Sequence, residues 1–80
     1  MKDKLTRLQE YLLNNGYEQD AKRIGGILEE YLKEDQLSEL SARKLIAMCN
    51  PKYFGNFYIR EFNNTYEWWN FLSEVVSDIR

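Results

Sequence analysis

Apolar residues recur at helical spacing from the start of the chain. The first stripe repeats at i, i+3 and i+7: Leu5, Leu8 and Leu12. This spacing predicts an amphipathic helix over about residues 3–14. Gly16 closes the "NNG" that follows and suits the left-handed conformation in which many helices end.

A second apolar stripe is the most regular in the chain. It steps by four and three residues through Tyr17, Ala21, Ile24, Leu28 and Tyr31. The pattern predicts a helix over about residues 18–33, with Ile27 and Leu32 widening its apolar face. Because the connection to the first helix is short, the two helices should form an antiparallel hairpin.

Two adjacent glycines, Gly25 and Gly26, interrupt the second predicted helix. Together they cost roughly 2 kcal/mol of helix stability relative to alanine. Two explanations remain open. Either a neighbouring element such as a Trp ring approaches closely or the helix kinks there, or the glycines leave a dent that admits a side chain of a partner.

A third helix is predicted over about residues 37–49. Its apolar residues fall on two adjoining faces, which are Leu37, Leu40, Leu45 and Met48 on one and Ala42, Ile46 and Cys49 on the other. Asp35 or Ser38 is the expected N-cap. The helix should end before Pro51, because the residue before a proline disfavours helical conformation.

The last helix should begin near residues 63–65, where Asn64 and Glu67 have the spacing of a capping box. Its expected apolar face comprises Trp68 or Trp69, then Leu72, Val75, Val76 and Ile79. We expect Trp69 to be buried and Trp68 to lie nearer the rim. Arg80 would suit the negative end of the helix dipole.

The segment 51–64 breaks the helical pattern and is rich in aromatic residues. It holds five of the twelve in the chain: Tyr53, Phe54, Phe57, Tyr58 and Phe62. Fourteen residues is long for a connection between helices. We therefore expect Phe54, Phe57 and Ile59 to plug the core. The remaining candidates for binding are Tyr53, Tyr58 and Arg60. Of these, Tyr58 and Arg60 should be exposed.

These elements predict a single all-α domain over residues 1–80, in which the first two helices pack against the last two and a long aromatic loop joins the third and fourth. The sequence has no run of 18 apolar residues, so no membrane span is predicted. The charged N-terminal stretch lacks the apolar core of a secretory signal. Cys49 is the only cysteine, which favours a reducing compartment, a cytoplasmic location and a buried structural thiol.

The net charge of −2 hides a segregation along the chain. Residues 29–39 hold five acids against one lysine, a net charge of −4. Residues 40–60 hold four basic residues and no acid, and residues 61–80 hold four acids against one arginine. Either the opposite blocks face each other in the fold, or they present a polarised surface to a partner.

Composition leaves little room for catalysis. The chain has no histidine, which is the commonest general base and the commonest transition-metal ligand, and one cysteine cannot form a zinc cluster. No EF-hand, Walker or dinucleotide-binding pattern occurs. Glu61, between Arg60 and Phe62, is the nearest candidate for a carboxyl group with a shifted pKa. The sequence therefore predicts no enzyme, no cofactor and no metal site.

By elimination the sequence favours a non-catalytic protein–protein interaction module, whose partner is an unidentified protein or a second copy joined through the Trp-bearing helix. The candidate binding residues are Tyr53, Tyr58, Arg60, Trp68, Glu30, Glu34 and Asp35. One form is an immunity- or antitoxin-like inhibitor, whose acidic face masks a basic partner.

The alternative is single-stranded nucleic-acid binding through residues 43–60, where cations alternate with aromatic rings. The acidic composition and the small number of cations argue against nucleic acid as the partner, and no membrane partner is expected.

The stretches "YLLNNGYEQDAKRI" and "FGNFYI" resemble a group of small, uncharacterised bacterial helical proteins. The first matches that group's Leu-Leu…Gly helix pair, and the second matches its Gly-Ser-Phe-like turn before the last helix. The Asp of that turn is absent, and Asp20 stands where the group has an aromatic residue. The resemblance implies an all-helical fold and no established activity, although some proteins of this type look like toxin-neutralising partners.

Overall fold

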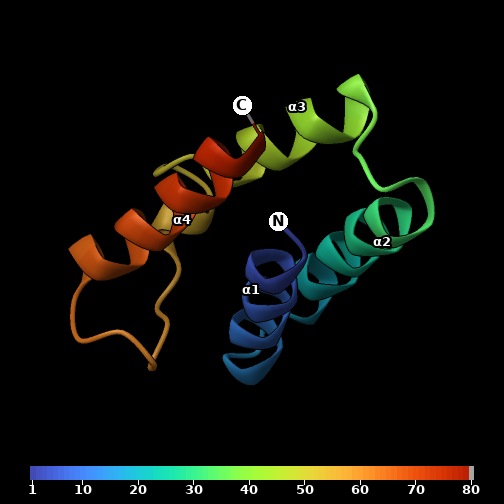
Figure 1. The fold of residues 1–80 in the computed structure, drawn as a ribbon. Helices are drawn as coiled ribbons and strands as arrows, with labels where there is room; N and C mark the ends of the chain where they lie inside the picture. The colour runs from blue at the N-terminus through green and yellow to red at the C-terminus, as the bar shows by residue number, and fades with distance from the viewer. Residues whose placement is uncertain (80) are drawn as a thin grey trace.

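The computed structural model describes residues 1–79 and has an all-α fold with four α-helices (Figure 1). These are α1 (Lys2–Asn14), α2 (Glu18–Glu34), α3 (Glu39–Met48) and α4 (Thr65–Ile79), with a short 3₁₀ helix, η1 (Phe54–Asn56), between α3 and α4. The predicted all-α class and the predicted number of helices are confirmed. The expectation for Arg80 lies outside the described residues.

The helices α1 and α2 lie side by side and antiparallel, as the short connection predicted (Figure 1). The turn between them is fixed by two backbone hydrogen bonds, in which Gly16 N–H donates to Leu13 O at 3.3 Å and Tyr17 N–H donates to Leu12 O at 2.9 Å. Gly16 has φ +87°, the left-handed conformation that this pattern of bonds requires and that only glycine adopts at little cost.

The two chain regions that are farthest apart in sequence meet in the fold. The α-amino group of Met1 lies 3.4 Å from Asp78, and Lys4 Nζ lies 3.0 Å from the same carboxylate. Side-chain hydrogen bonding from Lys4 lowers the pKa of Asp78, so this carboxylate stays charged and joins the start of α1 to the end of α4.

One continuous cluster of buried side chains joins the elements. Its members are Leu5, Leu8, Leu12, Ala21, Ile24, Ile27, Leu45, Met48, Cys49, Phe54, Ile59, Trp68, Phe71, Leu72 and Val75. Within residues 1–79 no charged or polar side chain is buried with them. The predicted stripes of α1 and α2 therefore supply much of this core, except that Leu32 is 55% exposed.

The expectation for the tryptophans is wrong. Trp68 is only 2% exposed and donates its indole N–H to Phe54 O at 2.6 Å, whereas Trp69 is half-buried. Trp68 lies one turn from Phe71 and Leu72, which are both buried, so the packed face of α4 is centred on these residues. The loop that precedes α4 accepts a hydrogen bond from each indole, because Trp69 N–H also donates to Gly55 O at 2.9 Å.

The predicted start of α3 is two residues early. Ser38 is the N-cap, and its Oγ accepts from Ser41 N–H at 3.1 Å. Asp35 instead ends α2 in a left-handed conformation with φ 58°. Because α3 packs with its C-terminal half, through Leu45 and Met48, Leu40 near its start is 64% exposed and is not a core residue as predicted.

The capping box predicted for α4 forms. Glu67 N–H donates to Asn64 Oδ1 at 3.0 Å, and the Glu67 carboxylate accepts from Asn63 N–H at 2.9 Å. The return bond reaches one residue further out than the usual pattern, but it still satisfies a backbone donor ahead of the helix.

The two glycines of α2 have different surroundings. A Cβ at Gly25 would lie 2.7 Å from Gln9 Nε2, so Gly25 allows the close approach of α1 through a glutamine and not through a Trp ring. A Cβ at Gly26 would meet nothing within 4 Å. Within the described chain, a side chain of α1 therefore packs against the first glycine and none packs against the second.

Candidate functional site

The aromatic loop between α3 and α4 packs onto the end of the α1–α2 hairpin. Phe54 and Ile59 are buried, and the half-buried Phe57 stacks on Tyr17 with ring centroids 3.9 Å apart and planes 4° apart. Phe62, also half-buried, contacts Tyr11 edge to face at 5.0 Å. The predicted core plug of Phe54 and Ile59 is confirmed, and Phe57 takes part in it from the edge.

The loop backbone is held by the turn between α1 and α2. Tyr58 N–H donates to Tyr17 Oη at 3.0 Å, and Arg60 N–H donates to Asn15 Oδ1 at 3.0 Å. The guanidinium of Arg60 also donates to Asn14 O at 2.7 Å. These bonds fix residues 58–60 on both sides of Ile59, whose buried side chain points into the core.

Glu61 closes this network from the loop side. Its two carboxylate oxygens accept from Asn15 Nδ2 at 2.8 Å and from Asn14 Nδ2 at 3.3 Å. The hydrogen bond from Asn15 is the main cause that lowers the pKa of Glu61, so the group is held in its charged form. Glu61 was the nearest candidate for a shifted pKa, and the downward direction of its shift suits an anchor and not a general acid.

The structure separates the loop residues that were predicted to bind. Tyr58 is 75% exposed and Arg60 is also exposed, as predicted. Tyr53 is half-buried, and its Oη donates to Asp20 Oδ1 at 2.6 Å and accepts from Arg23 Nη1 at 2.8 Å. The hydrogen bond to Asp20 is the main cause that raises the pKa of Tyr53, and the hydroxyl is engaged inside the fold. Of these loop side chains, Tyr58 protrudes most freely.

Trp68 and Glu30, which were candidates for binding a partner, have structural roles instead. Trp68 is buried, with only 2% of its surface exposed, and is not a protruding anchor for a partner. Glu30 accepts from Ser38 N–H at 3.0 Å and from Ser41 Oγ at 2.9 Å, so its carboxylate lies at the N-terminus of α3, where negative charge is favourable. The hydrogen bond from Ser38 is the main cause that lowers the pKa of Glu30.

Glu34 and Asp35, the other two predicted acidic residues, are exposed at the end of α2. They lie at the junction with α3, away from the loop in sequence and in the fold (Figure 1). The acidic candidates and the aromatic candidates therefore do not form one site.

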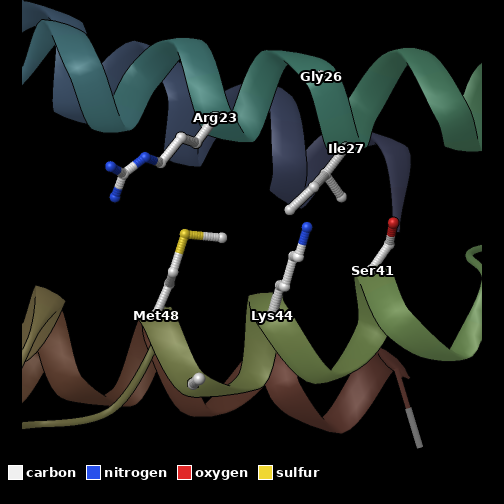
Figure 2. A pocket seen from close by; sticks show the side chains of 7 residues that line it. Arg23, Gly26, Ile27, Ser41, Lys44 and Met48 are labelled. Atoms are coloured by element: carbon white, nitrogen blue, oxygen red, sulfur yellow. The ribbon is translucent and has the colours of Figure 1, made fainter.

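A groove between α2 and α3 was not anticipated from the sequence. Its volume is about 510 Å³, and it is lined by Arg23, Gly26, Ile27, Ser41, Lys44, Ala47 and Met48 (Figure 2). Figure 2 shows Ile27 of α2 and Met48 of α3 directed into the space between the helices, with the Lys44 amine beside Ile27. The groove thus combines apolar walls with two cations, Arg23 and Lys44.

The segment 43–60 does not present alternating rings and cations on one surface. Phe54 is buried, and Phe57 is stacked on Tyr17. Arg43 pairs with Glu39 one turn away on α3. A nucleic acid would therefore find one free ring, Tyr58, in place of a row of stacking rings.

Cys49 is buried, and this burial raises the pKa of its thiol to about 12. The thiol is therefore protonated at neutral pH, which fits the expected structural role. In the described part of the chain, no three His, Cys, Asp or Glu side chains gather closely enough to share a metal ion. None of the helices in residues 1–79 combines the length and hydrophobicity that a membrane span requires.

Comparison with known proteins adds no further constraint on the site. No protein-family model, no curated protein and no solved structure matches the chain.

Proposed function

We propose that the chain is a non-catalytic protein-binding domain that presents Tyr58 to a partner protein. The observation that carries this proposal is the contrast between the backbone and the side chain of Tyr58. Its N–H is bonded to Tyr17, and the neighbouring Arg60 is bonded at two points to the preceding turn. The Tyr58 side chain nevertheless remains 75% exposed.

Rigid support lowers the entropic cost of binding, because the loop need not be ordered when the partner arrives. Tyrosine is among the residues that dominate interface hot spots, since it offers a large apolar ring and a hydroxyl with few rotatable bonds. A fixed backbone with one protruding tyrosine is the arrangement that such a hot spot requires.

A hollow beside Tyr58 supplies a second element of the proposed surface. Its volume is about 320 Å³, and its walls include Tyr58, Phe62, Thr65 and Trp68. A partner side chain that enters this hollow would contact the tyrosine ring on one side and the half-buried Phe62 on the other. The recess also has polar walls, at Asn63, Asn64 and Thr65, so the proposed contact is a tyrosine anchor next to a recess of mixed polarity.

The charge around Tyr58 is balanced, because the Arg60 guanidinium and the Glu61 carboxylate both lie in the same bonded network. The surface thus favours a partner chosen by shape and apolar contact. An immunity- or antitoxin-like role remains one form of the proposal, and its support is limited to the exposed Glu34 and Asp35. We place the activity in the reducing cytoplasm, which the lone buried Cys49 supports.

The proposal is tested by capture from cells of the source organism with three tagged baits: the natural chain, Tyr58→Ala and Tyr66→Ala. Tyr66 is a matched control, because it is a tyrosine of similar exposure, 73%, on a different element. Proteins held by the natural chain and by Tyr66→Ala, but lost from Tyr58→Ala, support the proposal. Equal recovery by all three baits contradicts it, provided that circular dichroism shows the same helical content for each.

A further inference from the structure

Gly26 lies in the interior of α2, and nothing in the described residues packs against its Cβ position. Glycine is the least favourable residue in a helix interior apart from proline. At Gly25 a Cβ would meet the end of the Gln9 side chain, but a Cβ at Gly26 would meet nothing within 4 Å. Gly26 is exposed, and its φ is not in the left-handed region. An exposed helical glycine of this kind suits the close approach of a helix from another molecule.

Within about one turn on either side of Gly26, the charges on α2 reverse sign. Lys22 and Arg23 lie one turn before it, and Glu29 and Glu30 lie one turn after it. At 3.6 residues per turn, Lys22 and Glu29 fall on one side of Gly26, whereas Arg23 and Glu30 fall on the other side. Each side of this face therefore carries a cation towards the N-terminus and an anion towards the C-terminus.

This pattern is complementary to itself. A two-fold axis that passes between two antiparallel helices reverses the direction of one helix and keeps each side opposite the same side of its partner. With the axis at Gly26, Lys22 faces Glu29 of the second copy. This pair can form across the axis without breaking an internal bond, whereas Arg23 and Glu30 are already bonded inside each copy. In a parallel pair the like charges would face each other.

We propose that two copies of this chain pair through α2, antiparallel and two-fold symmetric about Gly26. The occupant of the α2 face is thus a second copy of the same helix, chosen by charge complementarity and by the absence of a side chain at the crossing point. This surface is separate from the loop around Tyr58, and the inference stands without the function proposed above.

The space around Gly26 allows this pairing. Gly26 lies at the edge of the groove between α2 and α3, and it also lines a second hollow with Glu29, Leu32 and Lys33, whose volume is about 480 Å³. Figure 2 shows that α3 approaches α2 from the side of Ile27, while Gly26 lies at the rim of the groove. The second helix would enter over this rim, near the exposed Leu32.

Lys22 and Glu29 form the pair to test. Both side chains are exposed, and neither belongs to the ion pairs found within residues 1–79. Arg23 is already bonded to Tyr53 and paired with Asp20, and Glu30 is bonded to Ser38 and Ser41. Substitutions at Lys22 and Glu29 therefore change the proposed interface and leave the internal network intact.

The experiment is sedimentation equilibrium of the natural chain, Lys22→Glu, Glu29→Lys and an equimolar mixture of the two variants, at concentrations up to about 1 mM, which covers weak specific association. We expect the natural chain to dimerise and each variant alone to dimerise at least about tenfold more weakly, because both symmetric pairs become repulsive. The mixture should regain the natural affinity, since the glutamate introduced into one variant then faces the lysine introduced into the other.

Any of three outcomes would overturn the proposal: the natural chain is monomeric at every concentration, the single variants dimerise as tightly as the natural chain, or the mixture does not regain the natural dimerisation affinity. Gly26→Leu adds an independent readout, because it should abolish dimerisation while circular dichroism shows an unchanged helical content. Tyr58→Ala should dimerise normally, so that a failure of this inference is distinct from a failure of the Tyr58 surface.

Discussion

Tyr17 and Phe57 stack face to face, with ring centroids 3.9 Å apart and planes 4° apart, and they join the α1–α2 hairpin to the loop that precedes α4. The hydroxyl of the same tyrosine accepts from Tyr58 N–H at 3.0 Å. A single side chain thus positions both the core side and the exposed side of the loop. The stability of the loop and the presentation of Tyr58 should therefore respond together to changes at Tyr17.

Tyr17→Phe keeps the stacked ring and removes the acceptor for Tyr58 N–H. We expect the free energy of unfolding to fall by about 1 kcal/mol, the usual net value of one hydrogen bond. Urea denaturation followed by circular dichroism measures this change. Tyr66→Phe is the control and should have no effect, because no hydrogen bond of the Tyr66 hydroxyl occurs in the described chain; equal losses in both variants would contradict the assignment.

Trp68 and Trp69 should differ in their contribution to stability. Trp68→Ala leaves a cavity at a site that is 2% exposed and should cost about 3–5 kcal/mol, enough to unfold a domain of this size or bring it close to unfolding. Trp69→Ala affects a half-buried ring and should cost less. Thermal denaturation of both variants decides the order, and a more damaging Trp69→Ala would mean that α4 packs with its other face.

Gly25→Ala and Gly26→Ala should have unequal effects on the monomer, measured at low protein concentration. Gly26→Ala should raise the free energy of unfolding by up to about 1 kcal/mol, because alanine favours the helix and the added methyl group meets no neighbour. Gly25→Ala should gain less or lose stability, since its methyl group must displace the Gln9 side chain. Equal gains in the two melting temperatures would show that the Gln9 side chain moves aside at no measurable cost.

The network of Glu61 should make stability depend on pH. The folded pKa of Glu61 is lowered from the ordinary value of 4.5, so its contribution is present above that value and is lost as the pH falls through the folded pKa. We expect the urea concentration at the unfolding midpoint of the natural chain to decrease when the pH is lowered below about 4.5. Glu61→Gln should make this decrease smaller. Glu74→Gln, at an exposed position on α4, serves as the control and should retain the full pH dependence.

The helices could be predicted because each carries its own periodic apolar stripe, and the caps at Ser38 and Asn64 are local signals in the sequence. The choice between Trp68 and Trp69 could not be predicted in this way. Both residues fit an amphipathic α4, and both indoles donate to the loop, Trp68 to Phe54 O and Trp69 to Gly55 O. The choice therefore depends on which face of α4 packs on the core, which the local pattern does not encode.

The binding candidates show the same limit. The exposure of Tyr58 and Arg60 follows from the alternation along the loop. The internal role of Tyr53 depends on Asp20, which lies 33 residues earlier in the chain. The groove at Gly26 depends on the position in which α3 packs against α2, and the sequence carries no local signal for that position.

The most direct test of the proposed function is the affinity of the captured partner, once purified, for the natural chain, Tyr58→Ala and Tyr66→Ala, measured by isothermal titration calorimetry. We predict that Tyr58→Ala raises the Kd by at least about tenfold, as expected for an interface hot spot, and that Tyr66→Ala leaves the Kd unchanged. An unchanged Kd for a folded Tyr58→Ala variant would contradict the claim that this loop is the binding surface.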